Sequence, residues 1–93
     1  MEYSKYISIS ENNGQSILTV NDYELFDFLD DFFVGQNLQA AFVSKQIKED
    51  GCELHSFHFD PTHTAQSIHQ VLHKIQASEI DRICSLDRLV INP

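Results

Sequence analysis

Residues 22–33 read Asp-Tyr-Glu-Leu-Phe-Asp-Phe-Leu-Asp-Asp-Phe-Phe, and this stretch decides how the first half of the chain folds. On a helical wheel of about 3.6 residues per turn, its apolar side chains fill one continuous arc and its acidic side chains fill most of the opposite arc. The apolar set is Leu25, Phe26, Phe28, Leu29, Phe32 and Phe33, and the acidic set is Glu24, Asp27, Asp30 and Asp31. The pattern predicts an amphipathic helix whose outer face carries only carboxylates.

This acidic face works against the stability of the helix that carries it. Like charges three or four positions apart cost a helix about 0.2–0.5 kcal/mol per pair, and the helix dipole disfavours anions toward the C-terminal end, where Asp30 and Asp31 lie. A cationic surface on another molecule would explain the arrangement. Tyr23 flanks the carboxylates and belongs to the residue types enriched at interface hot spots. The simpler interpretation, an ordinary solvated face of a soluble protein, stays open.

The composition predicts one folded domain spanning residues 1–93. The chain is 42% hydrophobic and 11% aromatic, with only three glycines, which is typical of a globular protein with a single core. Its formal net charge is −8; residues 1–34 hold seven acids and one base, and residues 35–93 hold seven acids and five bases. This charge argues against binding a nucleic-acid backbone or an anionic membrane surface.

The chain shows no signal for export or membrane insertion. Residues 1–6 lack a basic region followed by an apolar run, and no stretch approaches the roughly 20 apolar residues that a membrane span needs. We therefore expect a cytoplasmic protein, in which Cys52 and Cys84 remain thiols in a reducing compartment.

Two β-hairpins are expected around the acidic helix. Strands over 6–10 and 15–20 flank a turn at 11–14 that ends in Asn-Gly, and strands over 38–47 and 52–59 flank a turn at 48–51 that ends in glycine. Asn21 is expected to cap the start of the acidic helix and Gly35 to supply its left-handed C-terminal cap. Because residues 40–43 are apolar on both faces, this strand is expected to be central in the sheet.

Two helices and a last strand are expected to complete the fold. Asp60-Pro61-Thr62 predicts the start of a second helix that runs to about Ile75. A short helix containing Ile80 and Ile83 follows, and residues 89–91 suit a terminal edge strand. The predicted class is α+β: one two-layer domain of ββαββα order, plus the short helix and terminal strand, with an antiparallel sheet and the helices on one face.

Five histidines fall between residues 55 and 73. His69 and His73 are four apart on the predicted second helix, so both could reach one zinc ion, with His58, His55 or Cys52 on the preceding strand as further ligands. The stretch lacks the glutamate of the HExxH signature, and its spacing matches no closed structural zinc site. We therefore expect solvent-exposed histidines and no cofactor, and keep His69, His73 and His58 only as alternative metal ligands.

No arrangement typical of an enzyme is present. Neither cysteine has the positively biased surroundings that activate a thiol, since Glu53 adjoins Cys52 and Cys84 lies on an apolar stripe. The chain also has no Gly-rich phosphate loop and no GxSxG turn. We therefore expect a protein without catalytic activity.

Small size, strong acidity and the Glu24, Asp27, Asp30 and Asp31 cluster together resemble the small acidic bacterial toxin-immunity proteins of the contact-dependent inhibition or bacteriocin type. The resemblance implies an inhibitor that binds a cognate basic toxin, such as a nuclease, and blocks its active-site cleft. One alternative is a nucleic-acid mimic of the phage anti-defence type, although Lys45, Lys48, Lys74, Arg82 and Arg88 nearly balance the second half. Another is a regulatory domain that binds a metal or ligand through its histidines.

Overall fold

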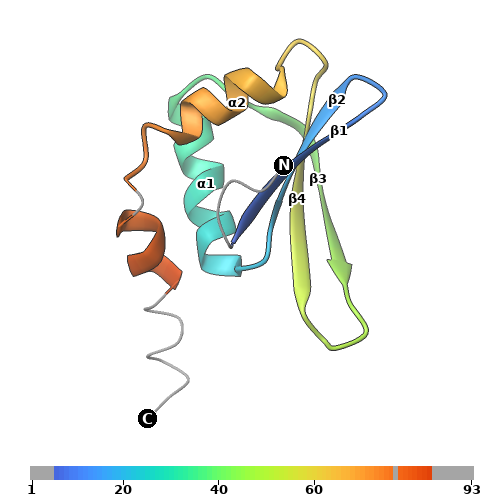
Figure 1. The fold of residues 1–93 in the computed structure, drawn as a ribbon, viewed down its shortest axis with the longest axis vertical. Coiled ribbons are helices and arrows are strands. Elements are labelled where there is room, and N and C mark those ends of the chain that lie inside the picture. Colours follow the sequence, from blue (N-terminus) through green and yellow to red (C-terminus); the bar gives the residue numbers. More distant parts are fainter. Residues whose placement is uncertain (1–5, 77, 85–93) are drawn as a thin grey trace.

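The computed structural model describes residues 6–76 and 78–84, and these form a small α+β domain. Four antiparallel strands make one sheet, and the helices lie together on one side of it (Figure 1). The predicted class and the placement of the helices are confirmed. The predicted strand at residues 89–91 lies outside the described residues.

The first hairpin joins β1 (Ile7–Asn12) to β2 (Gln15–Val20) through the residues Asn13 and Gly14. Their φ angles are 55° and 80°, as a tight hairpin with two left-handed positions requires. The turn is shorter than the predicted 11–14 turn, because Glu11 and Asn12 continue the strand and Asn12 pairs with Gln15.

Helix α1 (Tyr23–Gly35) begins and ends one or two residues away from the predicted caps. Asp22, rather than Asn21, is the N-cap: its carboxylate accepts the Leu25 N–H at 2.9 Å. Gly35 stays within the helix, and Asn37 takes the left-handed conformation with φ of 57°. Asparagine tolerates this region because its short polar side chain bonds locally.

The end of α1 is closed by two backbone hydrogen bonds of the Schellman type. The Asn37 N–H donates to the Val34 carbonyl at 3.2 Å, and the Leu38 N–H donates to the Phe33 carbonyl at 2.9 Å. Leu38 and Phe33 are both buried. The turn therefore directs the chain out of α1 and into the second hairpin.

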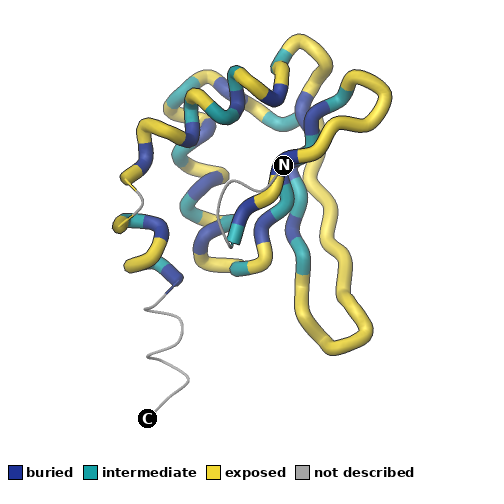
Figure 2. The backbone as a smooth tube through the Cα atoms, viewed as in Figure 1, coloured by how far each residue is buried: buried dark blue, intermediate teal, exposed yellow. Residues whose placement is uncertain are grey.

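The second hairpin consists of β3 (Ala40–Ile47) and β4 (Glu53–Phe59), joined by a loop in which Gly51 has φ of 86°. The strand order is β1-β2-β4-β3. The prediction that β3 is central is therefore wrong: β4 pairs with β2 and occupies the central position, and β3 forms an edge. Figure 2 shows β3 exposed along almost its whole length.

The core lies between the sheet and the helices. Alternate residues of three strands point into it, as a sheet with one covered face requires. The strands contribute Ile7, Ile9, Leu18, Val20, Phe57 and Phe59, and α1 contributes Leu25, Leu29 and Phe33. The buried arc of α1 is thus narrower than the predicted apolar arc, because Phe26, Phe28 and Phe32 are only half-buried.

Helix α2 (Ala65–Leu72) is shorter than the predicted helix. Thr64 is its N-cap and accepts the Ser67 N–H at 3.1 Å. Asp60 instead forms a separate turn, accepting the Thr62 N–H at 3.0 Å, and this hydrogen bond lowers the pKa of the Asp60 carboxyl. The prediction that the helix starts at residues 60–62 is therefore wrong.

After α2 the chain turns and enters a further helical segment at residues 78–84, where a short helix was predicted. Ile80 and Cys84 are buried in this segment and Ile83 packs against the core. Ile75, in the turn before it, is also buried. Among the described residues, no helix combines the length and apolar character needed to cross a membrane.

Candidate functional site

The carboxylates of α1 are displayed on its outer face because the opposite face is fixed in the core. Leu25, Leu29 and Phe33 lie four residues apart and are each no more than 2% exposed. This anchoring sets the rotation of the helix about its axis. The side chains on the other faces, Glu24, Asp27, Asp30 and Asp31, are all exposed.

Among the described residues, no ion pair joins these acidic residues to a basic side chain. The ion pairs among residues 6–76 and 78–84 join Glu53 to Lys45 at 3.5 Å, Glu53 to His55 at 3.3 Å, and Arg82 to Glu79. None of them includes a carboxylate of α1. The last turn of the helix also carries no basic residue. The face is therefore an uncompensated negative surface, which attracts cations and cationic proteins over roughly a Debye length.

An aromatic cluster holds the N-terminal half of α1 against β4. The ring of Phe26 stacks on Phe57 with a centroid distance of 4.6 Å and lies 4.9 Å from the ring of His55. Tyr23 meets His55 edge-on at 5.5 Å and remains 59% exposed. The structure thus places Tyr23 at one end of the acidic face, with its position fixed on one side and accessible to solvent on the other.

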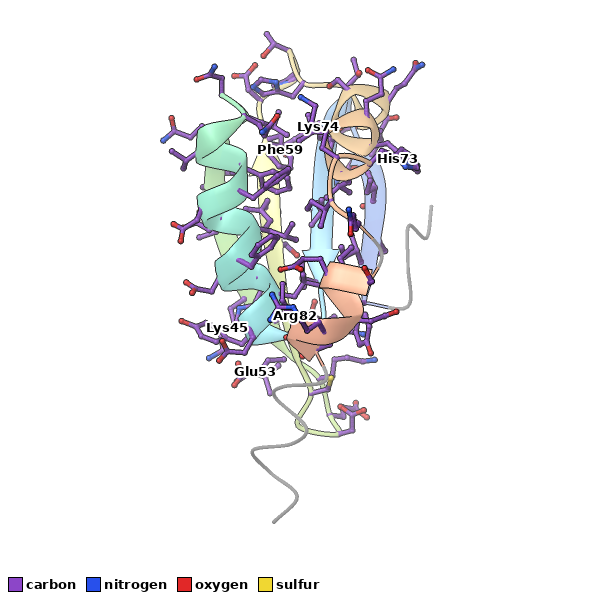
Figure 3. All side chains as sticks on the ribbon, turned by 90° about the vertical axis from the view of Figure 1, so that its left-hand side faces the viewer. Lys45, Glu53, Phe59, His73, Lys74 and Arg82 are labelled. Carbon is purple, nitrogen blue, oxygen red and sulfur yellow. The ribbon has the colours of Figure 1, made fainter. Side chains whose placement is uncertain are left out.

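His55 is buried beneath this cluster, which corrects the expectation that the histidines are solvent-exposed. Its side chain is 8% exposed, and its Nε2 atom lies 3.3 Å from Oε1 of Glu53 without the geometry of a hydrogen bond. Glu53 also pairs with Lys45 of β3. Figure 3 shows Lys45 and Glu53 close to the end of α1 at which the helix begins.

Beside the acidic face lies a pocket that the sequence did not predict. It has a volume of about 120 Å³ and lies between α1 and the edge strand β3. Asp30 and Val34 of α1 line one side, Ala40 and Val43 of β3 line the other, and Phe57 contributes from β4. Val43 pairs with Phe57 and therefore points to the same side of the sheet as the helices.

The large apolar side chains that remain exposed lie on the same two elements, α1 and β3, and two of them, Val34 and Val43, line this pocket. Among the described residues, every large hydrophobic side chain with high exposure lies on α1 or β3. These are Tyr23, Val34, Phe42, Val43 and Ile47, at 52–65% exposure. The exposed positions of β1, at the other edge, are polar: Ser8, Ser10, Glu11 and Asn12. The two edges therefore differ in character, and only β3 presents apolar side chains to solvent.

Of the histidines named as alternative metal ligands, His69 and His73 lie side by side and His58 lies apart from them. His69 lies on α2 and His73 is its C-cap, and their ring centroids are 4.7 Å apart. Figure 3 shows His73 projecting away from α1. His58 lies on the other face of the sheet, where it stacks on Phe42 at 4.2 Å. Within residues 6–76 and 78–84, no group of three or more potential ligands is close enough to hold a metal ion.

The described residues include two kinds of candidate nucleophile, the cysteine thiols and the Ser44 hydroxyl. Cys52 is exposed, Cys84 is buried, and no disulfide joins them. Ser44 Oγ lies 2.8 Å from Nε2 of His58 on the open face of the sheet, but no hydrogen bond among the described residues links this ring to a carboxylate. The Ser44–His58 pair therefore lacks the third group that orients a catalytic histidine. Its hydrogen bond instead links the neighbouring strands β3 and β4.

Comparison with known proteins gives no relative to which this surface can be matched: no protein-family model, curated protein or solved structure matches the chain.

Proposed function

We propose that this protein is a non-catalytic, acidic inhibitor that binds a basic protein partner, as an immunity protein binds the nuclease toxin it neutralises. The observation that carries the proposal is the row of exposed carboxylates on α1 without an ion pair among the described residues. A nuclease cleft is lined with cations because it binds phosphates. An anionic helix that enters such a cleft excludes the substrate without any chemistry of its own.

Tyr23 and the carboxylates have different roles in this proposal. Opposite charge accelerates encounter and sets orientation, whereas buried aromatic contacts contribute most of the affinity. Tyr23 is held by His55 at 5.5 Å while 59% of its surface remains exposed. A side chain that is already ordered loses less entropy when a partner covers it.

The test uses the immobilised protein and a lysate of its native host. The lysate is applied at low salt and eluted with rising salt, and the retained proteins are identified. We expect a basic protein to elute sharply. The captured protein should associate with the wild-type chain faster at low salt than at high salt. The captured protein is then tested for toxicity and nuclease activity with and without the inhibitor.

A charge-reversal variant decides whether α1 is the surface involved. In Asp27→Lys/Asp31→Lys, both changes lie on the exposed face of α1, so the fold should remain intact while association slows. Glu11→Lys/Glu49→Lys makes the same change in net charge at exposed positions on β1 and in the hairpin loop, so it is the matched control. If both variants slow association equally, net charge and not α1 is responsible; if neither does, α1 has no part in binding.

A further inference from the structure

We infer that the edge strand β3 is a second part of the partner-binding surface, where an extended segment of the basic partner adds to the sheet as a fifth strand. The inference rests on the proposed function and specifies how the partner is held. The segment would place an apolar side chain in the pocket between α1 and β3 and a lysine or arginine, two residues along, beside the α1 carboxylates.

The first argument is the condition of the edge itself. β3 is the last strand in the order β1-β2-β4-β3, and seven of its eight residues, all but Ala40, are exposed. An unpaired edge presents a row of backbone donors and acceptors that an added strand can satisfy. Natural edges are usually blunted by polar residues, as β1 is, whereas β3 exposes Phe42, Val43 and Ile47.

The second argument is the pocket. Val43 is 52% exposed and Val34, across from it on α1, is 65% exposed, and both line the pocket of about 120 Å³. A strand paired with β3 would place alternate side chains on the helix side of the sheet. One of them would lie over Val43 and cover the apolar surface that the isolated protein leaves in water.

The third argument is charge, which selects the occupant. Asp30 lines the pocket, and Asp27 and Asp31 are exposed on the same helix. A second copy of this chain is the obvious competitor, since two β3 strands could pair about a two-fold axis. That pairing would place both α1 helices on one face of the joined sheet, and each chain has a net charge of −8. Like-charge repulsion therefore disfavours the second copy and favours a basic segment.

Lys45 does not contradict this choice. It lies on β3 on the helix side of the sheet, opposite His55, and lysines on edge strands discourage indiscriminate pairing. Its Nζ atom lies 3.5 Å from Oε1 of Glu53 on β4. The positive charge of Lys45 is therefore partly offset by Glu53 of the same hairpin. Lys45 forms no ion pair with the carboxylates of α1, which stay available to a basic partner.

The test uses a short synthetic peptide with threonine at every second position. Valine and lysine take turns at the positions between, so that they share one face of the strand. A second peptide has glutamate in place of lysine. Binding to the whole protein is followed at low salt by amide NMR spectra and by hydrogen exchange of each residue. We expect saturable binding of the lysine peptide only, with alternate amides of β3 gaining protection, because only alternate N–H groups point away from β4.

Two variants of equal charge provide the control. Val43→Lys adds a charge to the pocket and should weaken peptide binding by roughly tenfold or more, as loss of a central interface contact does. Ser8→Lys adds the same charge to an exposed position on the other edge strand and should change the affinity less than about twofold. The NMR spectra of the free variants report whether each remains folded.

Each contrary result has its own meaning. Binding that shifts α1 resonances while the β3 amides stay unprotected would overturn the strand-addition inference and leave the proposed function standing. No binding of the lysine peptide, or equal binding of the glutamate peptide, would also overturn it. Protected β3 amides in a dimer without peptide would show that the second copy is the occupant. The proposed function fails on a separate result, the absence of any retained basic protein in the lysate experiment.

Discussion

Neutralising the end of the acidic row should make the protein more stable while making it a poorer binder. In the Asp30→Asn/Asp31→Asn variant, the like-charge pairs of Asp27 with residues three and four positions later disappear. Both changed side chains are exposed, and asparagine and aspartate have similar helix propensities. The core contacts of α1 therefore remain as they are.

The magnitude follows from the number of pairs. Each like-charge pair costs roughly 0.2–0.5 kcal/mol, so removing both should raise the free energy of unfolding by about 0.4–1 kcal/mol at low salt. The dipole penalty expected for Asp30 and Asp31 from the sequence is small in the structure, because α1 extends to Gly35 and both residues precede its last turn. For a domain of this size the melting temperature should rise by roughly 2–8 °C.

Urea unfolding followed by far-UV circular dichroism measures this effect, at low salt and again near 1 M salt, where the Debye length falls to about 3 Å. The gain should shrink at high salt. Glu11→Gln/Glu49→Gln, at exposed positions on β1 and in the hairpin loop, makes the same change in net charge and should be stabilised less than Asp30→Asn/Asp31→Asn at low salt, because it removes no like-charge pair within a helix. A loss of stability, a gain that salt leaves unchanged, or an equal gain in the control would refute the reasoning.

The same variant then distinguishes a binding face from an inert one. An inert solvated face predicts the gain in stability and no change in association with a basic partner. A face retained for binding predicts that the gain in stability is accompanied by slower association at low salt. Opposite signs for stability and association are the result that we expect.

Further predictions concern the core, the end of α1 and the turn before α2. Phe33 is 2% exposed and packs edge-on against aromatic rings of β4, so Phe33→Ala should cost about 3–5 kcal/mol, and half-buried Phe32→Ala should cost clearly less in the same urea titration. Asn37 has φ of 57°, so Asn37→Ala should cost about 1 kcal/mol, whereas Asn37→Gly should retain wild-type stability; equal losses in both would contradict the left-handed cap. The hydrogen bond from the Thr62 N–H lowers the pKa of the Asp60 carboxyl below its ordinary 3.8. The stability that this hydrogen bond contributes is therefore complete above pH 3.8 and is lost as the pH falls through the folded-state pKa of Asp60. Asp60→Asn, whose amide oxygen accepts the same bond without titrating, should therefore differ from wild type less at pH 3 than at pH 7; a difference in urea midpoint that is independent of pH would contradict this assignment.

The features that were predicted correctly depend on residues close together in the chain. The Asn13-Gly14 turn needs two left-handed residues in succession, and the helix at residues 23–35 needs only apolar side chains at helical spacing. The acidic row of α1 was therefore visible as soon as the helix was recognised. Caps were misplaced by one or two residues because several neighbouring polar side chains can each satisfy the same terminal amides.

The features that were missed depend on which elements meet in space. Strand β3 was expected to be central because residues 40–43 are apolar on both faces, but pairing of β2 with β4 leaves β3 at the edge. The same pairing puts His55 beneath Tyr23 and Phe26, in a position that its polar side chain alone did not indicate. Such strand pairings depend on how much apolar surface the whole sheet buries, and this cannot be predicted from a local sequence pattern.

The sequence by itself determined the α+β class, the first hairpin and the row of carboxylates, because hydrogen bonding within a turn and the periodicity of a helix are set by neighbours along the chain. Only the tertiary structure decided that this row lies beside an open apolar strand and that Val34 and Val43 line one pocket. Those residues are distant in sequence and come together because α1 covers β2 and β4 and leaves β3 uncovered among the described residues.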